Sequence, residues 1–139
     1  MARILVPVDG SAGSDKAVRF AISLLEEKYK EIILLNVQYS YDTPNIKRFV
    51  GQKEIRSYQE QLSKEVLAHT LEIANNFTRT RTIVRIGDPG REICAEAKKG
   101  YVDFIVMGYK RPGAVKRIFS GSVASHVLQA TTCPVMIVP

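Results

Sequence analysis

Short apolar runs alternate with longer amphipathic stretches along the chain. The runs have the length and the β-branched content of strands buried on both faces of a sheet. They are residues Ile4–Val8, Ile32–Val37, Thr82–Ile86, Phe104–Met107 and Val135–Val138. Strands that alternate with helices in this way predict right-handed crossovers. The pattern therefore predicts an α/β fold with an open, mostly parallel five-stranded sheet and helices on both faces.

The stretches between these runs repeat apolar residues every three or four positions, as amphipathic helices do. Ser11 or Ser14 is a natural N-cap, so the first helix should start within residues 11–14. Residues 39–51 contain Asp, Thr, Pro and Asn in succession and are predicted to form a loop. A long helix should follow, with an apolar stripe made of Ile55, Leu62, Val66, Ile73 and Phe77, and with Leu67 and Leu71 beside it.

Two further helices are marked by their ends. Asp88 and Pro89 are typical of a helix start, and we expect Gly100 to end that helix in a left-handed conformation. A short helix is predicted over residues 122–130. The sequence has neither an internal repeat nor a linker, so we expect one domain over residues 1–139.

Composition agrees with a folded globular domain, because 45% of the 139 residues are hydrophobic and 24% are charged. No segment approaches the roughly 18 apolar residues of a membrane span. The first residues run into a strand without a signal-peptide pattern, so we expect a cytoplasmic protein. Cys94 and Cys133 are too few for a disulfide framework or a zinc cluster, and small buried hydrophobes are the expected role.

The net charge of +6 is concentrated in one window. Residues 98–117 hold six Lys and Arg against Asp103 alone, a net of +5, and no charged residue follows Arg117. A nucleic-acid binder usually shows a broader basic face, often with aromatic residues for stacking. We therefore expect no nucleic-acid partner. The window favours a local anion site, and a solvated loop is the alternative.

Parallel sheets bind ligands beyond the carboxyl ends of their strands, where the strand order reverses. Asp9 and Gly10 end the first predicted strand. The Asp9 carboxylate either caps the following helix or accepts hydrogen bonds from a ribose or an adenine. Met107 and Gly108 end the fourth strand.

The segment from Gly108 to Val123 contains three glycines and four cations and leads into a helix. Backbone N–H groups at such a helix start, beside Gly121, can form a nest for phosphate, and Ser122 adds a hydroxyl donor. The spacing matches neither a Walker A loop nor GxGxxG.

Catalysis has little support in the sequence. His69 lies on the stripe of the long helix and is predicted to be packed or partly buried, and His126 is predicted to face solvent. Neither has a nucleophile and an acid in a recognisable arrangement. We therefore expect no catalytic residue and no metal site made by the protein alone.

Several motifs together resemble the universal stress protein family. Its glycine pattern (Gly, two residues, Gly, nine residues, Gly-Ser or Gly-Thr) is matched by Gly108 and by Gly121-Ser122, but Arg111 stands in place of the second glycine. The opening ILVPVDGS, the Gly-Asp-Pro at 87–89, the DFIVMG at 103–108 and the closing CPVMIV are also similar, so the resemblance covers the whole chain.

The resemblance implies a Rossmann-like, adenine nucleotide alpha hydrolase-like fold and a stress-response regulator that binds ATP or AMP, with any Mg²⁺ carried by the phosphates. By position, it implies adenine contacts from Pro7, Val8, Asp9 and Val37, ribose or α-phosphate contacts from Met107 and Gly108, and phosphate contacts from Lys110, Arg111, Gly121, Ser122 and Val123. Arg111 either fills the space that the glycine leaves or clamps a phosphate with its guanidinium. The alternatives are a dimeric interaction protein of the same fold without nucleotide, and a slow ATP hydrolase or phosphotransferase.

The uncharged strand Val135–Val138 would be a pairing hazard at a sheet edge. In similar proteins this edge pairs with its copy in a second subunit, so we expect a homodimer through this strand; coverage by the protein's own loop is the alternative.

Overall fold

The computed structural model describes residues 1–39, 51–74, 79–109 and 121–139. Its strands are β1 (Ala2–Pro7), β2 (Lys30–Gln38), β3 (Thr80–Ile86), β4 (Phe104–Gly108) and β5 (Val135–Val138). Its helices are α1 (Ala12–Ser23), the 3-10 turn η1 (Glu27–Tyr29), α3 (Gln52–Ile73), α4 (Pro89–Lys99) and α5 (Gly121–Ala130). The five strands are all parallel, in the order β3-β2-β1-β4-β5. The predicted fold class is confirmed.

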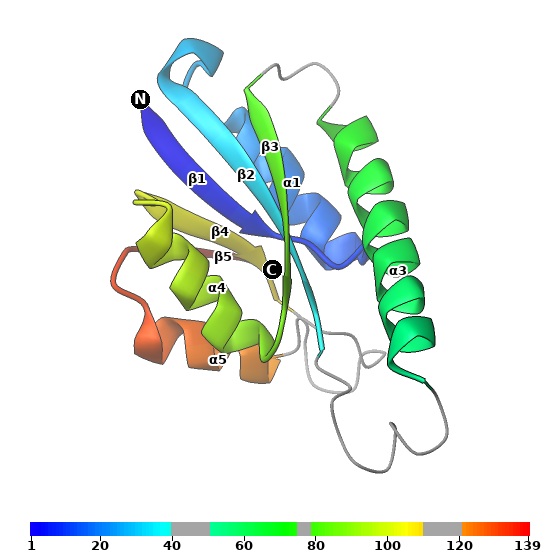
Figure 1. The fold of residues 1–139 in the computed structure, drawn as a ribbon. Coiled ribbons are helices and arrows are strands. Elements are labelled where there is room, and N and C mark those ends of the chain that lie inside the picture. Colours follow the sequence, from blue (N-terminus) through cyan, green and yellow to red (C-terminus); the bar gives the residue numbers. More distant parts are fainter. Residues whose placement is uncertain (40–50, 75–78, 110–120) are drawn as a thin grey trace.

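Helices cover both faces of the sheet, as Figure 1 shows. Alternate side chains of a strand point to opposite faces, so each central strand supplies two cores. Leu5, Ile33 and Ile105 pack under α4 and α5, whereas Ile4 and Ile32 pack under α1 and α3. Burial on both faces explains why these strands are continuous apolar runs in the sequence.

A buried lysine completes the end of α1. The helix ends without glycine, and Leu25 takes the left-handed conformation with φ 61°. Lys30 at the start of β2 is 1% exposed, and its Nζ donates to the carbonyls of Ala21 (3.1 Å), Leu24 (2.6 Å), Leu25 (3.2 Å) and Ile22. A side chain from a strand thus satisfies carbonyls that the helix leaves unpaired.

Helix α4 begins as predicted and ends differently. Asp88 is the N-cap and accepts from Arg91 N at 3.0 Å, with Pro89 in the first turn. Gly100 has an ordinary φ of −86°, and the left-handed residue is Tyr101 with φ 50°. The prediction for Gly100 was wrong, because the chain turns one residue later, where Val102 N bonds to the carbonyl of Ala97.

Helix α3 packs on the sheet with both polar and apolar side chains. Its buried side chains are Gln59, Ser63 and Thr70, while the apolar residues predicted to form its stripe are only partly buried and Leu71 is 42% exposed. Phe77, the last residue predicted for the stripe, lies outside the described residues. Val66 and Ile73 of the predicted stripe, with Leu67 beside it, pack against the core under α1 and α3, so the stripe is confirmed there, whereas Leu71 is not part of the packed face. Among the described residues, no helix is long and apolar enough to span a membrane.

Candidate functional site

The strand order places the candidate site at the carboxyl ends of β1 and β4. The chain builds outward from β1 through β2 to β3 and then returns to the other side of β1 as β4. The connections after β1 and β4 therefore leave in opposite directions, and a crevice opens between them in folds of this class. Both strand ends that the sequence singled out lie at this point.

Asp9 organises the turn between β1 and α1. Asp9 is only 8% exposed, and its Oδ1 accepts a hydrogen bond from Ser11 N at 2.9 Å. Ser11 is the N-cap of α1, since its side chain accepts from Ser14 N at 3.2 Å. The Ser14 hydroxyl in turn accepts from Asp9 N at 3.3 Å. Asp9 therefore supports the cap without being the cap, and the predicted start of α1 is confirmed.

Gly108 lets α1 approach β4. A Cβ built on Gly108 would lie 2.5 Å from the carbonyl oxygen of Gly13. Such contact is shorter than real Cβ atoms allow, so any side chain here would force the first turn of α1 away from the strand. The glycine has a packing role that the family resemblance alone does not reveal.

The start of α5 packs beside the ends of β2 and β4. Val37, Met107 and Val123 belong to one buried cluster, and the side chains of Val37 and Met107 are fully buried. Gly121 is partly exposed and Ser122 is exposed in the same first turn of the helix. The N-terminal turn of α5 lies at the positive end of the helix dipole, which favours an anion.

The structure places Val37, Met107 and Val123 in one buried cluster, whereas Val8 belongs to the cluster on the opposite face of the sheet. Pro7 and Val8 are buried at the end of β1, and Val8 N donates to the carbonyl of Leu35 at 2.8 Å. Lys110 and Arg111 lie outside the described residues. Contacts with a nucleotide stay predictions for all of these residues.

A buried polar network next to Val8 was missed by the sequence reasoning. Asn36 is fully buried and its Nδ2 donates to the carbonyl of Val8 at 2.9 Å. Its Oδ1 accepts from Gln38 Nε2 at 2.8 Å and from the Ser63 hydroxyl at 2.9 Å. The amide thereby ties β1, β2 and α3 together. The signal was present in the sequence, because Asn36 interrupts the apolar run ILLNV.

Helix α3 also contacts the chain just after β2, through Gln59, which lies one turn before Ser63. Gln59 Nε2 donates to the carbonyl of Tyr39 at 2.5 Å. Together with Ser63, it fixes α3 to β2 through polar contacts, which explains why the buried residues of this helix are polar.

Neither histidine forms a catalytic arrangement in the part of the chain that the structure describes. The His69 side chain is 48% exposed, and its Nε2 lies 2.8 Å from Asp15 Oδ2, so the ring joins α3 to α1. His126 is exposed, as predicted, with its Nδ1 3.6 Å from Asp88 Oδ2. No group of three His, Cys, Asp or Glu that could hold a metal occurs among the described residues.

The cysteines are both free thiols and only partly buried, packed against the cluster under α4 and α5. Burial raises the pKa of the Cys94 thiol, and the nearby Cys133 adds a smaller effect in the same direction. A thiol with a raised pKa is a poor nucleophile at neutral pH, which agrees with a packing role.

Comparisons with known proteins extend over the entire chain. Residues 1–139 match the model of the universal stress protein family. Universal stress protein YxiE of Bacillus subtilis is 32% identical over 146 aligned positions, which cover 98% of this chain and 97% of the relative.

Solved structures agree with this match. The structure of MJ0577 from Methanocaldococcus jannaschii has a TM-score of 0.80 at 22% identity and covers 99% of this chain and 94% of its own. A family member from Arabidopsis thaliana, solved with AMP bound, has a TM-score of 0.71 at 19% identity and covers 99% and 91%. At these identities the structures support the fold.

Proposed function

Because the chain belongs to the universal stress protein family, we propose that it is a stress-response regulator that binds an adenine nucleotide, ATP or AMP. The proposed site is the carboxyl edge of the sheet between β1 and β4. The observation that carries the proposal is the packing of Val123 with Val37 and Met107, which brings the anion-favouring start of α5 beside two strand ends. The AMP-bound Arabidopsis structure supports the choice of ligand.

The proposed contacts divide along the nucleotide. Adenine would lie against Pro7, Val8, Asp9 and Val37, and the ribose or α-phosphate against Met107 and Gly108. Since the side chains of Val37 and Met107 are fully buried, their contacts would come from backbone atoms.

The phosphates would lie at the first turn of α5, against Gly121, Ser122 and Val123, with Lys110 and Arg111 supplying positive charge. The N–H groups of a helix start fit a phosphate, and the exposed Ser122 hydroxyl can donate to it. Any Mg²⁺ would be held by phosphate oxygens and water.

The direct test is to denature the purified protein, separate the released small molecules by ion exchange, and titrate the emptied protein with ATP and AMP by calorimetry. We expect a released adenine nucleotide or a heat of binding. No nucleotide and no heat at about 1 mM ligand, a limit that corresponds to very weak binding, would overturn the proposal.

Arg111 supports a second candidate, a dimeric interaction protein of the same fold with an empty site. Arg111→Gly separates the two, with Arg117→Gly as the control that removes a cation from the same segment. If Arg111 clamps a phosphate, Arg111→Gly should weaken ATP binding more than the control does. If Arg111 blocks the site, the same change should create or tighten binding.

We propose that the protein binds ATP without hydrolysing it. Bound ATP kept with Mg²⁺ for several hours should be recovered intact, whereas accumulation of ADP above a protein-free control would establish the slow hydrolase instead. We further propose that the protein is cytoplasmic, which fractionation of the source cells would test.

We also propose a homodimer through β5. Within the described residues β5 pairs with β4 alone, and its Met136 is 37% exposed. Met136→Lys would place a guarding charge on this edge. Light scattering should show a dimer for the unchanged protein and a monomer for the variant; a monomeric unchanged protein would refute the dimer without touching the nucleotide site.

A further inference from the structure

The opposite edge of the sheet, strand β3, offers backbone groups for pairing. Among the described residues β3 pairs only with β2. The carbonyl of Arg79 accepts from Ile32 N, and Gly87 N donates to the carbonyl of Gln38, so odd-numbered residues face β2. Since backbone direction alternates along a strand, the N–H and C=O groups of Thr82, Val84 and Ile86 point away from the sheet.

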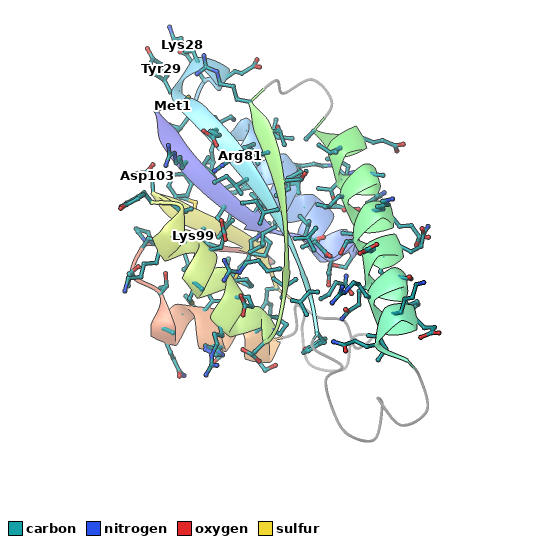
Figure 2. All side chains as sticks on the ribbon, in the orientation of Figure 1. Met1, Lys28, Tyr29, Arg81, Lys99 and Asp103 are labelled. Atoms are coloured by element: carbon teal, nitrogen blue, oxygen red, sulfur yellow. The ribbon has the colours of Figure 1, made fainter. Side chains whose placement is uncertain are left out.

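One face of this edge is a hollow in which the arginine side chains are more exposed than the carboxylates paired with them. A cavity of about 560 Å³ lies between β3 and the last turns of α4. It is lined by Arg81, Ile83, Val84, Arg85, Glu96, Lys99 and Gly100. Figure 2 shows Arg81 on β3 and Lys99 near the end of α4.

The cations of the hollow differ in their ion pairs and in their exposure. Arg85 Nε donates to Glu92 Oε2 and its Nη1 to Glu96 Oε2, each at 2.6 Å, so Arg85 binds β3 to α4. Arg81 is 53% exposed and pairs with Glu31 at 3.0 Å. Lys99 is exposed and has no ion-pair partner among the described residues. Lys99 can therefore bind an added anion without giving up an ion pair, whereas Arg81 would share its guanidinium between that anion and the partly buried Glu31 carboxylate.

The other face of the same edge carries the exposed side chains of Thr82, Val84 and Ile86 and is apolar over its second half. Val84 is 47% exposed and Ile86 is 52% exposed, although both belong to a strand and follow the alternation of its side chains. An added strand would thus meet positive charge with one set of alternate side chains and apolar surface with the other.

Charge also decides which strand can add here. Two copies of this edge would bring arginines opposite arginines, and like charges across a strand pair are unfavourable. An acidic strand would meet the opposite charge. We propose that β3 takes up an extended segment of a partner protein in which acidic residues alternate with apolar ones, the acidic side chains entering the hollow beside Arg81 and Lys99. This surface lies apart from the proposed nucleotide site.

The test uses the full-length protein and a fluorescent peptide as long as the 7 residues of β3, with Glu and Val alternating. A matched peptide with Lys in place of Glu tests charge. A third peptide, with alternate amides methylated so that they cannot donate, tests strand pairing. Fluorescence anisotropy should show saturable binding of the first peptide below about 1 mM and much weaker binding of the other two.

Two variants locate the binding. Arg81→Gln combined with Lys99→Gln should lower the affinity for the acidic peptide about tenfold, as removal of surface charges from an interface does. Val84→Pro removes one outward N–H, which an edge strand tolerates, and should abolish binding. Val84→Thr keeps that N–H and should change affinity little; circular dichroism confirms that each variant is folded.

Hydrogen exchange gives an independent measurement. The amides of Thr82, Val84 and Ile86 should become protected when the acidic peptide binds. No binding by about 1 mM, equal binding of the Lys peptide, or full binding to Val84→Pro would each overturn the proposal.

Discussion

Replacing Lys30 by Met tests whether a strand residue holds the end of α1. The side chain keeps its length but loses the ammonium that binds four carbonyls. An ammonium has three N–H donors, and a hydrogen bond to a charged group contributes roughly 1.5–3 kcal/mol. The variant no longer buries a charge, and water reaches the partly buried carbonyls. We therefore expect a net loss of about 1–3 kcal/mol, the cost of leaving buried carbonyl groups without their donor.

Urea denaturation measures this loss. With a slope of about 1–3 kcal/mol per M, the midpoint should fall by roughly 1 M at an unchanged slope. Lys28→Met is the matched control, because Lys28 lies in the adjacent turn with its side chain 65% exposed and 3.5 Å from Glu26. Its effect should stay below about 0.5 kcal/mol. If Lys30→Met costs less than about 1 kcal/mol, the lysine does not hold the helix end.

The pH dependence adds a signature. Burial lowers the pKa of the Lys30 amine below its ordinary value of 10.5, and Glu27 opposes this shift. The unfolded chain then binds more protons than the folded chain, so this group adds stability as the pH rises toward 10.5. The unchanged protein should show that rise, and Lys30→Met should lack it.

Three further changes probe the packing. Arg85→Met should lower the free energy of unfolding, measured by urea denaturation, by about 3–5 kcal/mol, because it leaves the buried Glu96 carboxylate without its cation. Arg81→Met breaks only a surface pair and should lower that free energy by less than about 1 kcal/mol. Gly108→Ala should destabilise by about 1–3 kcal/mol in calorimetry, and an unchanged Tm would refute the close contact with α1. In a Cys133→Ser protein, alkylation of Cys94 at pH 9 should be slower than in denaturant, since burial raises its pKa. Equal rates would contradict that burial.

Elements whose signals are local were predictable from the sequence. Both Ser11 and Asp88 cap helices where the sequence indicated, because a cap needs only a polar side chain a few residues from the N–H that it accepts. Lys30 was left out of the predicted strand, since a charged residue is rarely buried. Its burial depends on carbonyls of α1 that only the tertiary fold brings near it.

Part of the candidate site was likewise predictable from the sequence, and part of it depends on tertiary contacts. The ends of β1 and β4 follow from strand order, and motif similarity identified Gly108 and Gly121. The network around Asn36 did not follow, because its partner Ser63 is 27 residues away, and apolar periodicity does not indicate which polar residues of a helix are buried. The polar contacts of α3 add to the packing of its apolar residues Val66, Leu67 and Ile73.

The parallel sheet has a practical consequence for handling the protein. With every strand running in the same direction, Met1 lies at the amino ends of the strands, before the central strand β1, and Pro139 lies at their carboxyl ends, after β5 and next to the proposed nucleotide site. A purification tag after Pro139 would emerge beside the ends of β4 and β5, where it competes for space with a bound ligand. A tag before Met1 emerges at the opposite ends of the strands from that site, near Asp103. It is the better choice for every binding measurement described above.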